Sequence, residues 1–215
     1  KEFEAGILAE ANRSILYVDE INLLDDHIVD ILLDSAAMGI NTVEREGISY
    51  AHPARFVLVG TMNPEEGDIR PQLLDRFALS VTVTGEREAK DRIEVVKRRI
   101  AYEQDAEGFA ASYEEQQEAL RERIERARAL LKSVAVADGM LEKAAHISLA
   151  LGVDGHRADI TLIKAAMANA AFSGRTEVAK EDMKAVSRLV LAHRLRRRPF
   201  EEGEVDWSAV DDVLA

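Results

Sequence analysis

Several features are missing from the sequence, and each absence excludes a class of protein. The 215 residues contain no cysteine, which excludes a disulfide scaffold, a thiolate nucleophile and a thiolate metal site. No apolar run approaches the roughly 20 residues that a membrane-spanning helix needs. Basic residues are few, with 28 Lys and Arg against 40 Asp and Glu, and the formal net charge is -12. We therefore expect no membrane span and no nucleic-acid partner.

The residues that are present are typical of a folded protein. Hydrophobic residues make up 47% of the chain and charged residues 32%, which is enough to build a core. The length suits one large domain or two small ones. The chain starts at Lys1 rather than at a methionine and has no signal-peptide pattern, so we expect a sequence entered in the middle of a longer protein.

Residues 1–85 have the pattern of an α/β domain. Two apolar runs, residues 15–18 and 56–59, are typical of strands that are buried on both faces of a parallel sheet. Residues 79–84 alternate and suggest a third, more exposed strand. Residues 25–37 predict a helix between the first two strands, and residues 41–52 predict a β-hairpin that projects from the core.

The helix expected at residues 25–37 has clear signals at both ends. Asp25 or Asp26 can cap its N-terminus, and Gly39 fits its C-terminal end. Ile28, Leu32 and Ala36 recur at helical spacing and mark its apolar face.

Strand signals end after residue 85. Apolar residues at helical spacing predict an all-helical domain over residues 86–200, with a mobile acidic connector at about residues 103–114. The basic residues at 194–198 suit a solvated helix end, where cations match the helix dipole. Residues 201–215 form an acidic tail, whose residues 207–210 suit either a short docking helix or a loosely packed terminus.

The strongest chemical signal follows the first predicted strand. Residues 15–18 are apolar, and the two carboxylates of Asp19 and Glu20 come directly after them. Open α/β sheets bind ligands at the carboxyl edge of their parallel strands. In a nucleoside triphosphatase the first acid holds Mg²⁺ through water and the second polarises the attacking water. The alternative is a strand that simply ends in a polar loop.

Two later residues fit the same chemistry. Asn63 follows the second strand at the same sheet edge and can orient a water or bind a terminal phosphate, although a turn residue before Pro64 has the same appearance. The planar guanidinium of Arg76 suits a γ-phosphate, and a surface salt bridge with Asp75 is the alternative. The order of these residues along the chain is more specific than any one of them.

In that order the sequence resembles the second half of an AAA+ ATPase module, and more narrowly the ATPase motor subunits of magnesium chelatase. The matching stretches are residues 17–26, 33–37, 41–48, 52–56, 60–67 and 70–77. The resemblance is dense over residues 3–77 and thinner up to about residue 198. It implies a partial AAA+ P-loop core over residues 1–85, a helical lid over residues 86–200 and an acidic tail over residues 201–215.

The functional positions of the family have counterparts here. The resemblance implies that Asp19 is the Walker B acid associated with Mg²⁺ through water, and that Glu20 is the catalytic carboxylate. Asn63 matches the sensor-1 position. Arg76 matches the arginine finger, which serves the ATP bound by a neighbouring subunit.

Arg157 is the fifth counterpart. It matches the sensor-2 arginine, which contacts the nucleotide from the lid. A cation at a predicted helix N-terminus is unfavourable unless an anion is near, which agrees with that role. A pair with Asp154 or Asp159 is the alternative. The hairpin at residues 41–52 corresponds to the pre-sensor-1 insertion, expected to face a pore or a partner.

The resemblance also implies a wider function. A ring of identical subunits, expected to be a hexamer, would hydrolyse ATP with Mg²⁺ and drive Mg²⁺ insertion into protoporphyrin IX, a ligase reaction that forms nitrogen–metal bonds in (bacterio)chlorophyll biosynthesis and serves photosynthesis. The implied partners are a von Willebrand-like AAA+ subunit and a large porphyrin-binding subunit that performs the chelation. The implied location is cytoplasmic, or the chloroplast stroma in a plant or alga.

Two other functions stay open. A related AAA+ chaperone of the MoxR or cobalt chelatase type would use the same site on another client. A non-catalytic interaction module would keep the fold without hydrolysis. The presence of all five site residues argues against the module, because a site that has lost its function has no reason to keep every role.

The phosphate-binding loop of the family has no counterpart in this sequence. No Gly-x-x-x-x-Gly-Lys-[Ser/Thr] occurs, so the backbone and lysine groups that hold the β- and γ-phosphates are missing. In the family these groups lie upstream of the matching stretches.

We therefore predict that the 215 residues by themselves bind ATP poorly and do not turn it over. Isothermal titration of the isolated chain with ATP and Mg²⁺ should give no micromolar binding. A micromolar dissociation constant would contradict this prediction.

Overall fold

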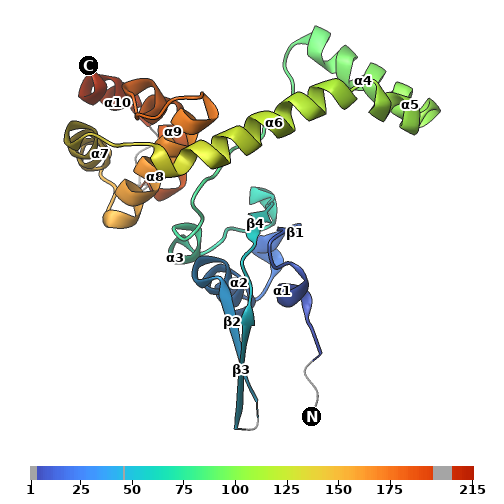
Figure 1. Cartoon of the computed structure of the whole chain (residues 1–215), viewed down its shortest axis with the longest axis horizontal. Coiled ribbons are helices and arrows are strands. Elements are labelled where there is room, and N and C mark those ends of the chain that lie inside the picture. Colours follow the sequence, from blue (N-terminus) through green and yellow to red (C-terminus); the bar gives the residue numbers. More distant parts are fainter. Residues whose placement is uncertain (1–3, 46, 196–204) are drawn as a thin grey trace. The chain divides into compact units, whose positions relative to one another are not determined.

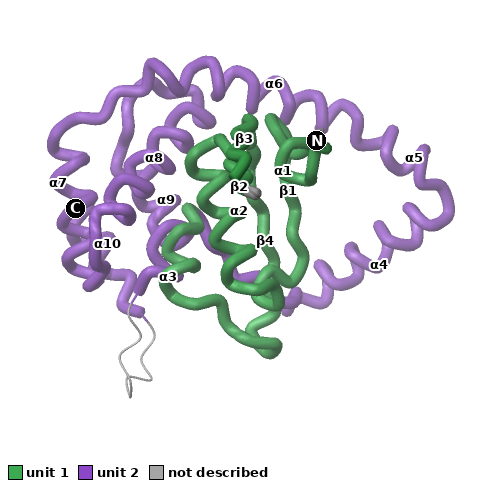
Figure 2. Tube along the Cα trace, turned by 90° about the horizontal axis from the view of Figure 1, so that it is seen from below, with its two compact units in different colours: residues 1–78 green, residues 79–215 purple. Residues whose placement is uncertain are grey.

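The computed structural model describes residues 4–45, 47–195 and 205–215. The chain divides into two compact units, residues 1–78 and residues 79–215, coloured separately in Figure 2. Among the described residues, every helix is too short or too polar to span a lipid bilayer.

Unit 1 contains the predicted α/β elements. In chain order they are α1 (Ile7–Glu10), β1 (Ile15–Val18), η1 (Ile21–Leu23), α2 (Asp26–Met38), β2 (Ile40–Arg45), β3 (Ile48–Pro53), β4 (Val57–Gly60), η2 (Pro64–Glu66) and α3 (Pro71–Leu74), which can be followed in Figure 1.

The strands β1 and β4 pair in parallel, which confirms the parallel arrangement, although the second strand begins one residue later than predicted. Ile15 lies opposite Val57, and Val18 opposite Gly60. The expectation that both faces would be buried is wrong for the described residues. Leu16 is buried, but the alternate residues Ile15 and Val57 are 65% and 61% exposed. Side chains alternate between the faces of a strand, and α2 packs on only one of them.

The helix α2 begins and ends as predicted. The side chain of Asp25 accepts a 2.9 Å hydrogen bond from the amide of His27, and Gly39 ends the helix in the left-handed conformation with φ 70°. The buried residues of α2 are Val29, Leu32, Leu33 and Ser35. Of the predicted apolar face, Leu32 is buried and Ala36 packs against the same cluster, whereas Ile28 is 47% exposed. The core-facing side of α2 therefore combines spacings of three and four residues, as in an amphipathic helix, whereas the predicted positions had a spacing of four only.

The predicted hairpin is present as the antiparallel pair β2 and β3. Ile40 lies opposite Pro53, and Arg45 opposite Ile48. Gly47 has φ 78°, a left-handed conformation that a tight turn needs and that glycine adopts without strain. The ribbon extends from the rest of unit 1 in Figure 1.

The predicted strand at residues 79–84 does not form. The structure gives this segment no strand, and the side chains of Val81 and Val83 are exposed. The amide of Ser80 donates to the carbonyl of Leu189 in α9 (Lys180–Leu191) at 2.8 Å. An alternating pattern becomes a strand only beside a partner strand. In the described structure, the parallel sheet consists of β1 and β4 alone.

Unit 2 starts at Leu79, and the regular elements among its described residues are helices. Besides α9 it contains α4 (Ala89–Gln104), α5 (Ala106–Ala111), α6 (Glu114–Leu130), η3 (Leu131–Ser133), α7 (Asp138–Ala150), α8 (His156–Phe172), η4 (Ala192–Arg194) and α10 (Ser208–Leu214).

The predicted connector at residues 103–114 is largely helical. Asp105 ends α4 and caps α5 by accepting a 2.9 Å bond from the amide of Gly108. The ring of Phe109 packs edge-on against Tyr102 and lies near Tyr113. These local aromatic contacts and the aspartate cap stabilise helix where the acidic composition suggested a mobile segment.

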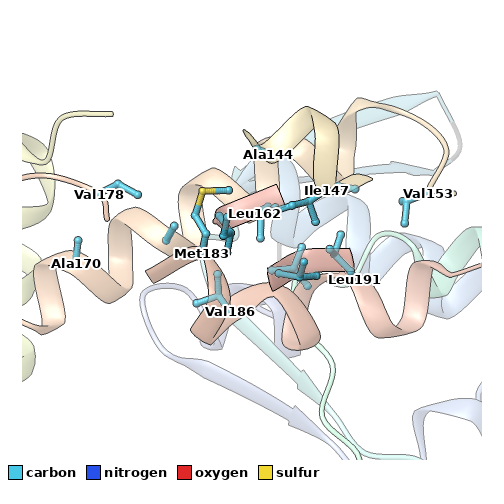
Figure 3. Packing of buried hydrophobic residues seen from close by; sticks show 14 of the residues in the cluster. Ala144, Ile147, Val153, Leu162, Ala170, Val178, Met183, Val186 and Leu191 are labelled. Carbon is cyan, nitrogen blue, oxygen red and sulfur yellow. The ribbon is translucent and has the colours of Figure 1, made fainter. Parts of the chain in front are cut away.

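The core of unit 2 lies among α7, α8, α9 and α10 (Figure 3). Ile147, Leu162, Met183 and Leu191 are fully buried there. The residues of α10 join this core through the buried Val210, so the docking-helix alternative for residues 207–210 is the observed one. Of the basic residues at 194–198, Arg194 is buried and donates to the carbonyl of Val190, and the others lie outside the described residues.

One buried charge organises the start of α9. Asp182 has no exposed surface and accepts hydrogen bonds from both terminal nitrogens of Arg175, from Asn169 and from the amide of Ala179. Burial by itself raises the pKa of a carboxyl group, but the bonds from Arg175, Ala179 and Asn169 outweigh burial and hold the pKa of Asp182 below its usual value. The ionised carboxylate therefore stabilises the folded unit.

We predict that Asp182→Asn lowers the free energy of unfolding by about 1.5–3 kcal/mol, the range for hydrogen bonds to a charged group. Because the folded pKa is depressed, the stabilisation is complete above about pH 4 and is lost as the pH falls through the folded pKa. Urea unfolding followed by circular dichroism at pH 7 and at pH 3 measures both effects, and the variant should lose this part of the acid dependence.

The matched control is Asp211→Asn, which removes an exposed pair with Lys184 in the same unit. Exposed pairs contribute less than about 1 kcal/mol. Equal destabilisation by the two substitutions would contradict the role of Asp182.

Candidate functional site

The candidate site lies at the carboxyl edge of the parallel pair. The chain of β4 stays bonded to β1 beyond Gly60, because the amide of Thr61 donates to the carbonyl of Val18 at 3.0 Å. The amide of Ile21 then donates to the carbonyl of Thr61 at 2.9 Å. These two backbone bonds place Thr61 directly beside the acidic end of β1.

The carboxylate of Asp19 is held by two hydroxyl groups. Its Oδ1 accepts a 2.5 Å bond from Thr61 Oγ1 and a 3.0 Å bond from Tyr17 Oη. These two bonds hold the pKa of Asp19 below its usual value. The bond from Thr61 has the larger effect, and the bond from Tyr17 has the second largest. An exposed carboxylate that stays ionised, with Oδ2 used in neither bond, can hold a hydrated cation.

Glu20 leaves the strand direction abruptly. Its backbone has φ 50° and ψ 48°, a left-handed conformation that is uncommon for residues other than glycine. The amide of Glu20 donates to Thr61 Oγ1 at 3.2 Å, so the hydroxyl that donates to Asp19 also fixes the turn at Glu20. The carboxylate of Glu20 is exposed at this edge.

A close contact between Ile21 and Gly60 stabilises the turn at Glu20. Ile21 is buried, and its side chain fills the space beside Gly60. A Cβ atom added at Gly60 would lie 3.0 Å from Ile21 Cγ2, which is too close for an undisturbed fold. The glycine at the end of β4 thus lets Ile21 pack where it fixes the chain after Glu20.

Asn63 stands two residues after Thr61, on the segment that leaves this sheet edge. Its Oδ1 accepts a 3.4 Å bond from the amide of Glu65 and so caps η2. Asn63 therefore has the turn role that was the alternative to a phosphate-binding role. A bond of this length is weak, and the amide group keeps its capacity to donate.

Arg76 lies against α2 rather than beside the acid pair. Its Nη1 donates to Asp30 Oδ1 and to Asp34 Oδ1, both at 2.8 Å. The segment that carries it is anchored by the buried Leu73, which packs in one cluster with residues of α2. Arg76 follows the end of α3, at Leu74.

Arg157 belongs to unit 2, in the first turn of α8, as predicted for a helix N-terminus. It is exposed, and its carbonyl accepts a 2.7 Å bond from Thr161 Oγ1. Asp159, one of its two alternative partners, lies 3.7 Å from His156 Nδ1.

Four residues that hold the predicted site residues in place were not predicted from the sequence. Tyr17 and Thr61 fix Asp19, and Asp30 and Asp34 fix Arg76. Thr61 had a usable signal, because it follows the second strand directly at the same edge as Asp19. The two aspartates of α2 recur at spacing four, but nothing local connects them to an arginine 42 and 46 residues away.

The donor set fits a magnesium ion held mainly by its substrate. Mg²⁺ takes one or two carboxylates together with waters and phosphate oxygens. Asp19 supplies an exposed carboxylate of this kind at the edge of the sheet, and Glu20 follows it in the chain. No cluster of three or more His, Cys, Asp or Glu suited to a metal occurs among the described residues, so an all-protein metal cage has no support there.

Two family models match the sequence. The model described as magnesium chelatase, subunit ChlI, matches residues 1–72, and the model described as the AAA lid domain matches residues 141–213. A crystal structure of a candidate ATPase from Cytophaga hutchinsonii superposes with a TM-score of 0.66 at 19% identity, covering 93% of this chain and 64% of that one, which shows a shared fold.

Curated relatives are similar over nearly the whole chain. The magnesium-chelatase subunit ChlI homolog of Methanocaldococcus jannaschii is 52% identical over 214 residues, which are 100% of this chain and 59% of that protein. The magnesium-chelatase 38 kDa subunit of Cereibacter sphaeroides is 52% identical over 202 residues, 94% of this chain and 60% of that protein. The chain thus spans about three fifths of these relatives. It belongs to the ChlI-type family of AAA+ subunits.

Proposed function

We propose that this chain is part of an ATP-hydrolysing motor subunit that drives magnesium insertion into protoporphyrin IX. The observation that carries the proposal is the Thr61 hydroxyl, which holds the carboxylate of Asp19 and the turn at Glu20 together at the sheet edge. An acid pair at this edge suits nucleotide hydrolysis. Relatives named as magnesium-chelatase subunits support the choice of client.

In the proposed reaction a water molecule attacks the γ-phosphorus of ATP, and the bond from this phosphorus to the β–γ bridging oxygen breaks, so that ADP and phosphate are released. Glu20, turned out of the strand by its left-handed backbone, polarises this water and accepts its proton. Asn63 orients the water or the terminal phosphate through its amide group, after it releases the weak bond to the Glu65 amide. The hydrogen bonds to Oδ1 keep Asp19 ionised and fixed throughout.

The residues of this chain also suit the two charged components of the substrate. Bound Mg²⁺ would neutralise charge on the β- and γ-phosphate oxygens, and Asp19 is the residue that would hold it through water. We assign Arg157 to contact the nucleotide from the lid, where its position in the first turn of α8 adds helix amides to its own charge.

Arg76 is proposed to act on the nucleotide of a neighbouring subunit. Such an arginine stabilises the charge that develops on the transferred phosphoryl group. A site completed by a neighbour requires a head-to-tail interface, and repetition of that interface closes a ring. We propose a hexamer of identical subunits.

The word subunit in the family description supports further partners. We propose a von Willebrand-like AAA+ subunit and a large porphyrin-binding subunit that carries out the chelation, in (bacterio)chlorophyll biosynthesis. The hairpin β2–β3, with the exposed apolar side chains of Val43, Ile48 and Tyr50, is the proposed contact surface for the pore or for such a partner.

We predict that Arg76→Ala and Glu20→Gln each abolish ATP hydrolysis by the complete protein and leave ATP binding unchanged. The arginine contributes about 10³–10⁵ in kcat when it acts in trans. The two inactive variants should regain activity when mixed, because about a quarter of the interfaces in a random ring would combine an intact Glu20 with an intact Arg76. Full activity of Arg76→Ala alone would rule out the trans role.

A coupled assay tests the proposed client. The complete protein, candidate partner subunits, ATP, Mg²⁺ and protoporphyrin IX should produce magnesium protoporphyrin, detected by its fluorescence, and Glu20→Gln should produce none. ATP hydrolysis without the metalloporphyrin would instead indicate a MoxR-like or cobalt chelatase-type client. An absence of ATP hydrolysis by the wild-type protein would indicate an interaction module.

A further inference from the structure

Three aspartates recur along α2 at intervals of one helical turn. Asp26, Asp30 and Asp34 stand four residues apart, so they lie on one face of the helix. All three pair with arginines of the segment at residues 70–76. Asp26 Oδ2 lies 2.5 Å from Arg70 Nε, and both Asp30 and Asp34 accept from Arg76.

The bonds to Arg76 have a particular geometry. Both carboxylates accept from the same nitrogen, Nη1, at 2.8 Å, and neither bond uses Nη2. The backbone before Arg76 is held independently, because Leu73 is buried in the cluster that contains Val29 and Leu33 of α2. Both the backbone and the tip of the arginine are therefore fixed on the same helix.

From this geometry we propose that Asp30 and Asp34 are positioning residues for Arg76. They hold Nη1 on α2, so that the Nη2 edge of the planar guanidinium is presented outward to the γ-phosphate of the nucleotide in the next subunit. Restricting a long side chain before the reaction removes its ordering cost from the transition state. This inference rests on the proposed function, in which Arg76 serves a neighbour.

Folding stability does not explain the arrangement. The side chains of Arg76, Asp30 and Asp34 are 34%, 46% and 58% exposed. Ion pairs with this much solvent contact contribute little to the free energy of unfolding. Asp30 and Asp34 together carry more negative charge than Arg76 neutralises, and this excess repels a phosphate. Electrostatic attraction of the phosphate therefore does not explain the arrangement either.

The test uses the complete protein with Asp30→Asn and Asp34→Asn combined. Asparagine keeps the shape of each side chain and removes its charge. We expect kcat for ATP hydrolysis to fall about 100-fold, the usual cost of a small misplacement of a catalytic group. The dissociation constant for ATP and the thermal midpoint should not change. The matched control Asp26→Asn, one turn away on the same helix face, should keep wild-type kcat.

Mixing experiments separate positioning from a folding defect. Subunits with Glu20→Gln carry an intact Arg76, so they should restore activity to the double variant, whose own Glu20 is intact. Subunits with Arg76→Ala should not restore it, because neither member of that mixture presents the arginine correctly. A misfolded double variant would be restored by neither partner.

Three results would overturn the inference while the wild-type protein hydrolyses ATP. The first is an unchanged kcat in the double variant. The second is a raised kcat, which would show that the aspartates restrain Arg76. The third is an equal loss of kcat in Asp26→Asn. An inactive wild-type protein would overturn the proposed function itself, so the two failures are distinguishable.

Discussion

The backbone of β4 continues past Gly60 and remains hydrogen-bonded to β1 through Thr61. The hydroxyl of that threonine donates to Asp19 and accepts from the amide of Glu20. The acid pair therefore depends on parallel strand pairing, because a shift of one residue would carry Thr61 to the other face of the sheet. The placement of Asp19 and of the turn at Glu20 follows from that register, and the phosphate chemistry proposed for them depends on it.

Helix α2 connects this edge to the second half of the candidate chemistry. Leu32 on its inner face packs in the cluster that contains Leu16 of β1, while Val29 and Leu33 pack with Leu73. Its aspartates hold Arg76 from another face. One helix thus fixes both the sheet that carries the acids and the segment that carries the arginine. A subunit with these two features in fixed relation suits a ring in which each interface needs both.

Unit 2 is built on a different principle. Its core is formed by α7–α10, and a buried aspartate, satisfied by an arginine, an asparagine and a backbone amide, fixes the start of α9. Arg157 stands on the surface of this independent core, in the first turn of α8. A lid with its own core can move as a unit, which suits a residue proposed to contact nucleotide from outside the sheet.

The sequence by itself determined the two strands of the parallel pair, the caps of α2, the hairpin, the helical second unit and the family, because these features depend on local spacing and on motifs that are contiguous in the chain. It also selected Asp19, Glu20, Asn63, Arg76 and Arg157 as candidates. Only the tertiary structure decided that Thr61 and Tyr17 hold Asp19, that Asp30 and Asp34 hold Arg76, and that residues 79–84 form no strand. Those contacts join residues that lie as many as 46 positions apart. Local periodicity does not indicate which distant side chains the folded chain brings together.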